Sequence, residues 1–223
     1  MWTWRWTSRL VWTVVIVLAV IGLAAVTRRV LDLAQVIPPT APTMRGGAFD
    51  AGFAQHPILT LTHIIPGALF MVLGPLQFVG RIRARHLWLH RLIGRVYVAD
   101  STVVGVTALI LSFRLTIGGG IETAATLLFA LIFLFALGKA VVHVRRGEIA
   151  RHREWMIRAF AIGLAVATIR PIIGLFFALT TLLPQQFFGY AFWIGFMLHV
   201  VAAELWITAT RARPVLAGRA ARA

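Results

Sequence analysis

Six stretches of this chain are each long and apolar enough to cross a lipid bilayer, and this constrains the fold more than any other feature. They run over Leu10–Thr27, Pro57–Gly80, Val96–Phe113, Thr123–Val144, Ala159–Leu183 and Phe188–Ala209. A helix that rises about 1.5 Å per residue needs roughly 20 residues to cross about 30 Å of hydrocarbon. Because 60% of the 223 residues are also hydrophobic, the sequence predicts an all-α integral membrane bundle of six transmembrane helices.

A single membrane domain is predicted over residues 1–223. Its parts are a Trp-rich anchor span over residues 1–27, an outer loop over 28–56, a five-helix core over 57–209 and a basic tail over 210–223. We interpret the first span as a retained anchor and not as a cleaved signal peptide. Its apolar run is longer than an ordinary signal sequence has, and Thr27-Arg28-Arg29 follow it directly.

The distribution of arginine predicts the orientation of the bundle. With the amino terminus inside, sixteen arginines fall in inner segments and four in outer ones. Because basic residues in short loops are retained on the cytoplasmic side, both termini are predicted to be cytoplasmic. The net charge of +15 then follows from topology and favours contact with anionic lipid headgroups, and no nucleic acid partner is predicted.

Few residues with recognisable chemistry remain once the usual motifs are excluded. The chain has no cysteine, which excludes disulfides, iron–sulfur clusters and thiolate zinc sites. It also lacks a phosphate-binding glycine loop, a nucleophile elbow and a carboxylate pair. No enzymatic activity is therefore assigned, and the candidates are histidines, arginines and a few intramembrane charges.

Two similar phrases open the third and fifth spans at the predicted inner face. They are His90-Arg91-Leu-Ile-Gly94-Arg95 and His152-Arg153-Glu-Trp-Met-Ile-Arg158. Arginine binds carboxylate or phosphate, and histidine binds metals or transfers protons. The cofactor-binding candidates are therefore His90, His152, Arg91, Arg95, Arg153 and Arg158. The metal candidates are His90, His152 and His86, which precedes His90 by four residues. The alternative is that these side chains only face lipid headgroups and fix the orientation.

A second group of polar residues lies inside the predicted spans. Its members are His63, Gln77, Asp100, Arg170, His199 and Glu204. Such residues are costly in a membrane unless they pair, bind a ligand or reach water. Asp100 and Glu204 are expected at similar depth, where they share a proton or bind Arg95 or Arg158. The alternative is that each charge is neutralised within the bundle and only stabilises helix packing.

Several phrases together resemble a known family. They are His63-Ile-Ile-Pro-Gly67, Gly74-Pro75-Leu-Gln77-Phe78, the two histidine–arginine phrases and Arg170. In this order they resemble the bacterial membrane family catalogued as domain of unknown function 2306, from about His56 to Arg170 and into the last span. The resemblance implies a multi-pass protein of the bacterial inner membrane and no established biochemical activity.

Three functional classes are consistent with these residues. The predicted one is a redox-associated protein that binds one haem b near the cytoplasmic face, through His90 and His152, with arginines on the haem propionates. The runner-up is an accessory or assembly subunit of a membrane complex, without a cofactor. The third is a small-molecule transporter or binding protein that uses the intramembrane polar residues.

Overall fold

The structure is a computed structural model that describes residues 2–36 and 52–211. Throughout these residues every regular element is a helix. The middle of the predicted outer loop, residues 37–51, and residues 212–223 of the predicted basic tail lie outside the described residues.

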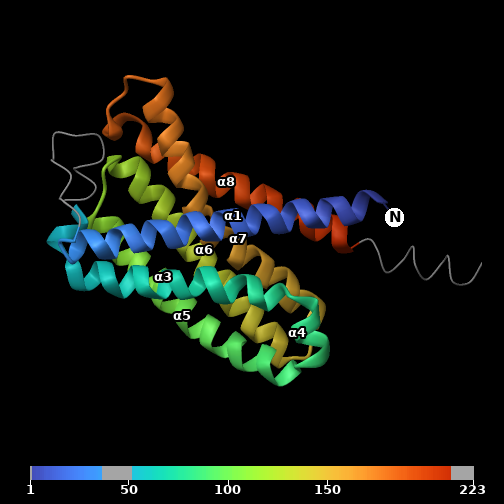
Figure 1. Ribbon diagram of the computed structural model, residues 1–223. Coiled ribbons are helices and arrows are strands. Elements are labelled where there is room, and N and C mark those ends of the chain that lie inside the picture. Colours follow the sequence, from blue (N-terminus) through green and yellow to red (C-terminus); the bar gives the residue numbers. More distant parts are fainter. Residues whose placement is uncertain (1, 37–51, 212–223) are drawn as a thin grey trace, which may run out of the picture.

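Six of the described helices are long and apolar enough to span a membrane, and the short helix α4 joins two of them. The helices are α1 (Trp2–Leu33), α3 (Pro57–Phe78), α4 (Gly80–Arg85), α5 (Leu87–Arg114), α6 (Gly119–Arg145), α7 (Ile149–Leu179) and α8 (Pro184–Arg211) (Figure 1). The prediction of six spans is confirmed. The short helix α4 was not expected, and it connects α3 to α5.

The helices are longer than the apolar stretches that identified them. α1 continues past Thr27 to Leu33, and α7 begins at Ile149, ten residues before the expected start at Ala159. Hydropathy marks only the part of a helix that lies in hydrocarbon, whereas a charged turn can remain helical beyond it. Proline begins α3 and α8, and Gly147, at a φ of 74°, turns the chain between α6 and α7.

Most of the apolar surface of these helices points away from the protein. Only 17–39% of the most apolar window of each span is buried inside the protein. In water, such a surface would be an aggregation hazard, whereas in a bilayer lipid covers it. The low burial therefore agrees with a multi-pass membrane protein.

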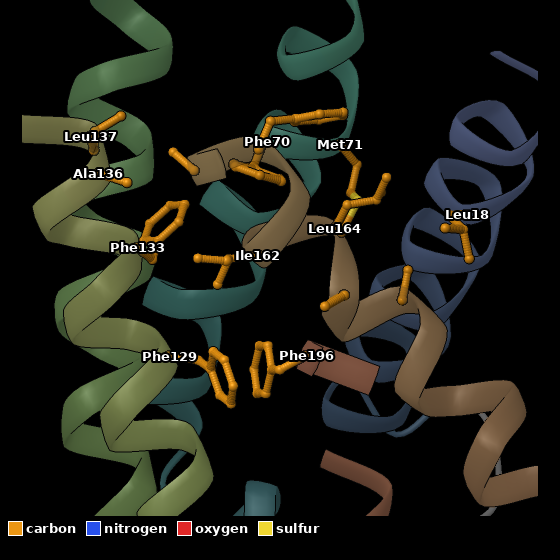
Figure 2. Packing of buried hydrophobic residues seen from close by; sticks show 14 of the residues in the cluster. Leu18, Phe70, Met71, Phe129, Phe133, Ala136, Leu137, Ile162, Leu164 and Phe196 are labelled. Carbon is orange, nitrogen blue, oxygen red and sulfur yellow. The ribbon is translucent and has the colours of Figure 1, made fainter. Parts of the chain in front are cut away.

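The buried core is built around Phe70 of α3. Its ring stacks on Tyr97 of α5 at 5.3 Å and on Phe160 of α7 at 5.7 Å. Gly163 of α7 makes this contact possible, because a Cβ there would lie 2.3 Å from the Phe70 ring. On α6, Phe129 stacks on Phe196 of α8 (Figure 2), with their ring centroids 4.6 Å apart. Small residues at such contacts let membrane helices approach closely.

The long helices alternate in direction, so the arginine-rich segments gather at one end of the bundle. Figure 1 shows the amino terminus, α4 and the last turns of α8 on the same side of the molecule. We call this side the basic end; it contains α4, the first turns of α5 and α7, and the last turns of α6 and α8. Along its length, α7 contacts α1, α6 and α8.

Candidate functional site at the basic end and the α3–α5 seam

His90 and His152 occupy equivalent places in two helices. Each is the fourth residue of its helix, since α5 begins at Leu87 and α7 at Ile149. Nδ1 of His152 lies 2.9 Å from the carbonyl oxygen of Ala140 on α6. A ring nitrogen bonded to a carbonyl must carry the hydrogen, so Nε2 of a neutral His152 keeps its lone pair. Nδ1 of His90 is buried and has no hydrogen-bond partner.

Positive charge surrounds these two imidazoles. The charged groups that act on His90 come from Arg83, His152 and Arg91. Arg83, on the unexpected helix α4, also acts on Arg153. The two histidine–arginine phrases, 62 residues apart by number (152 minus 90), are therefore brought together around α4. The arrangement suits an anionic ligand.

The structure does not support a larger metal site. His86 is the exposed residue that caps α5, and its φ of −136° is not helical. His86 is therefore the N-cap of α5, one turn before His90, and the His90 N–H donates to its carbonyl at 3.1 Å. Within the described part of the chain, no three histidines or acidic residues are grouped in a way that could hold a metal ion.

Two of the four arginines in the predicted site bind α8. Arg158 donates from Nε and Nη2 to the Glu204 carboxylate, at 2.6 and 2.9 Å. Arg153 donates from Nη2 to Oγ1 of Thr210 at 2.9 Å. Arg91 and Arg95 are exposed. The expectation that Glu204 binds Arg158 agrees with this geometry.

A further ion pair completes the contact between α7 and α8. Arg211, the last residue of α8, pairs with Glu154 of α7 through two hydrogen bonds. We call this pair, together with Arg158–Glu204 and Arg153–Thr210, the α7–α8 clamp. Sequence reasoning missed the role of Glu154 and Arg211, because a pair between two helices leaves no spacing signal along the chain.

The connection between α6 and α7 carries its own ion pair. Oε2 of Glu148 lies 2.7 Å from Nδ1 of His143 and accepts a hydrogen bond from Nη1 of Arg151 at 3.1 Å. These groups, the His143 imidazole first, lower the pKa of the Glu148 carboxyl. The pair fixes the turn that positions His152, whose backbone N–H donates to the Glu148 carbonyl at 2.9 Å.

Most of the predicted intramembrane polar residues have partners inside the chain. His63 is hydrogen-bonded to Thr107 at 2.9 Å, and His199 to Thr168 at 2.7 Å. Arg170 donates to the carbonyl of Val166 on its own helix at 2.7 Å. The charge of Arg170 acts on His63, in agreement with their expected proximity. Glu204 belongs to the clamp, so these residues are satisfied separately.

A different set of polar atoms is buried without any partner. In the described part of the chain it consists of Gln77 Nε2, His90 Nδ1, Tyr97 Oη, Asp100 Oδ2 and Ser101 Oγ. Gln77 lies on α3 and the others lie on α5. We call this set the α3–α5 seam. Sequence reasoning identified Gln77, His90 and Asp100 but missed Tyr97 and Ser101, although their spacing from His90, seven and eleven residues, places all three on one helix face.

Comparison with known proteins identifies the family and leaves its chemistry open. The family described as "Predicted membrane protein (DUF2306)" matches residues 60–207. The match includes nearly all of α3 to α8 and leaves α1 outside it. No curated protein and no solved structure matches the chain. With both histidine–arginine phrases and the seam inside the matched region, the chain belongs to the membrane protein family of domain of unknown function 2306.

Proposed function

We propose that this membrane protein binds one haem b at its basic end, between His90 and His152, and takes part in electron transfer. The observation that carries the proposal is the hydrogen bond from His152 Nδ1 to the Ala140 carbonyl, at 2.9 Å. Proteins commonly orient a metal-binding imidazole by such a bond on its other ring nitrogen. In this proposal His90, at the same position in its helix, binds the iron through Nε2 and leaves its buried Nδ1 to the α3–α5 seam.

The surrounding charges fit the acidic edge of a haem. Arg83 and Arg91 lie near His90, and Arg83 also lies near Arg153; guanidinium groups bind carboxylates such as haem propionates. In this proposal the histidines hold the iron and the arginines neutralise the propionates. A bound haem b supplies one-electron redox chemistry at its iron.

We also propose that the basic end faces the cytoplasm, in the inner membrane of a bacterium. The support is the excess of arginine at this end, which retains segments on the cytoplasmic side and attracts anionic lipid headgroups. Reporter fusions provide the test. A fusion at Ala223 should report a cytoplasmic location and one between Pro38 and Gly47 an external one.

An absorption spectrum of the detergent-purified protein tests the haem proposal. The wild-type protein, supplied with haem, should give a b-type spectrum that sharpens on reduction with dithionite. His90→Ala and His152→Ala should each abolish it, because a two-imidazole site loses a ligand. His86→Ala is the matched control and should keep the spectrum, since this exposed histidine only caps α5.

The absence of a haem spectrum in the wild-type protein would refute this proposal. A cofactor-free accessory subunit of a membrane complex would then be the better interpretation. We do not propose transport through the intramembrane polar residues, because His63, Arg170, His199 and Glu204 already have partners within the chain.

A further inference from the structure

We infer that the α3–α5 seam holds a chain of internal water molecules, which connects Asp100 in the membrane interior with the water at the basic end and carries protons to its carboxylate. This goes beyond haem binding and does not depend on it. If a haem is present, His90 can bind it through one ring nitrogen and face the seam with the other.

The unpartnered atoms extend along α5 from its first turn to its middle. His90, Tyr97 and Ser101 lie on one face, and Asp100 is adjacent to Ser101. At about 1.5 Å of rise per residue, Ser101 lies roughly 16 Å along the helix from His90. The unpartnered polar atoms are therefore distributed along a path and are not confined to one position.

This face of α5 is turned toward α3 and is closed to lipid. Tyr97 stacks on Phe70 of α3 at 5.3 Å. A Cβ on Gly94 would lie 3.1 Å from Oε1 of Gln77, so the two helices are close at this level. Tyr97 and Ser101 are 0% exposed, Gln77 6% and Asp100 8%. Lipid consequently has no access to these atoms, and protein does not bind them.

The chemistry of the seam matches water. Buried polar groups are nearly always hydrogen-bonded to protein or to ordered water, so five atoms without a protein partner in one seam require another partner. The Gln77 amide donates, the Asp100 carboxylate accepts, and the two hydroxyl groups can do both. Tyr97 and Ser101 are close enough for a mutual side-chain hydrogen bond, and the Asp100 charge acts on Tyr97, but their hydroxyl oxygens do not meet the geometry of a normal hydrogen bond.

Glu122 shows the other solution for a buried carboxylate: its Oε2 accepts from the backbone N–H groups of Ile117 and Gly118, at 2.9 and 2.7 Å.

Proton movement along such a path is chemically balanced. A hydronium ion at the basic end gives a proton to the first water, and each water accepts one proton and passes another on. The last proton is bound by the Asp100 carboxylate, which becomes neutral. Nothing is oxidised or reduced.

Infrared spectroscopy of the full-length protein in lipid nanodiscs tests the path. At a pH where Asp100 is protonated, its C=O band is assigned by its loss in Asp100→Asn. After transfer to D₂O this band should shift within seconds, although the side chain is buried.

Variants of the seam show whether the exchange uses this path. Tyr97→Phe and Ser101→Ala should each slow the exchange roughly tenfold or more, the factor that corresponds to the loss of one hydrogen bond from the path. Ser112→Ala is the matched control on the same helix, because the Ser112 hydroxyl already donates to the Leu109 carbonyl. It should leave the exchange rate unchanged, and so should the haem-ligand variant His152→Ala.

Two results would overturn the inference. The first is an Asp100 band that does not exchange over hours. The second is fast exchange that neither Tyr97→Phe nor Ser101→Ala slows, because protons would then reach Asp100 by another way. Neither result depends on whether the protein binds haem.

Discussion

The α7–α8 clamp and the α3–α5 seam use polar residues in opposite ways. In the clamp, Arg158 and Glu204 bind each other at 2.6 and 2.9 Å, and Arg211 binds Glu154. In the seam, buried polar atoms such as those of Tyr97 and Asp100 have no partner in the protein. A charge that is paired across two helices is explained by packing alone. A buried polar group without a protein partner is not explained by packing, and it suggests that the protein binds a further molecule there.

This difference gives the two regions different responses to mutation. Removing one partner from the clamp leaves the other charge uncompensated, which costs free energy. Removing a hydroxyl group from the seam breaks no hydrogen bond of normal geometry within the protein. Four predictions follow the comparison, from the largest expected effect to the smallest.

Gly74→Ala should have the largest effect, because it overpacks the contact between α3 and Phe160 of α7 beside the seam. A Cβ at Gly74 would lie 2.4 Å from the Phe160 ring, too close without a shift of α3 against α7. Overpacking of this kind costs about 1–3 kcal/mol. Thermal unfolding in detergent, followed by circular dichroism, measures the loss.

Gly67→Ala, on the same helix, is the matched control for Gly74→Ala. Nothing lies within 4 Å of a Cβ at Gly67. Its stability should therefore stay unchanged or rise by up to about 1 kcal/mol, the helix propensity gained on replacing glycine by alanine. Equal losses for the two variants would show that α3 is not packed as described.

Arg158→Ala should weaken the clamp by about 1–2 kcal/mol, since it breaks two hydrogen bonds to Glu204 in a pair that is partly exposed. The double variant with Glu204→Ala should lose less than the sum of the two single variants. Unfolding measurements on all four proteins give this coupling. Strictly additive losses would show that the pair does not stabilise the contact between α7 and α8.

Tyr97→Phe should change stability by less than about 1 kcal/mol, because the lost hydroxyl has no protein partner and the ring still stacks on Phe70. The same unfolding assay applies. A loss as large as that of Arg158→Ala would mean that the hydroxyl has a protein partner, and the contrast between seam and clamp would disappear.

Glu148 should give the smallest effect, and one that depends on pH. Hydrogen bonds, first from His143, place its pKa in the folded protein below the ordinary value of about 4.3. A carboxyl whose pKa is lowered by folding stabilises the folded protein at pH values above its ordinary pKa. That stabilisation is lost as the pH falls through the lowered pKa. Wild type should therefore unfold at a slightly higher temperature than Glu148→Gln at pH 7, and the difference should shrink as the pH falls below the ordinary value and vanish below the lowered pKa. A difference in unfolding temperature that grows as the pH falls would contradict this prediction.

Much of the fold follows from the sequence because hydropathy is a local property. The apolar stretches predicted six spans, and the phrases around His90 and His152 predicted residues that the structure brings near each other. The spans were predicted too short, because charged first turns such as the one that contains His152 remain helical outside the hydrocarbon. For the same reason α4 and the charge of Arg83 beside His90 were missed.

The sequence by itself determined that this chain is a multi-pass membrane protein with six candidate spans. Only the tertiary structure decided that Arg158 binds Glu204 while Tyr97 and Ser101 remain without partners. Successive residues point about 100° apart around a helix axis. Whether a side chain meets a hydrogen-bond partner therefore depends on which helices touch and on how each is rotated about its axis. Transfer of a residue from water to lipid depends on its own chemistry, whereas a hydrogen bond depends on where a second residue lies.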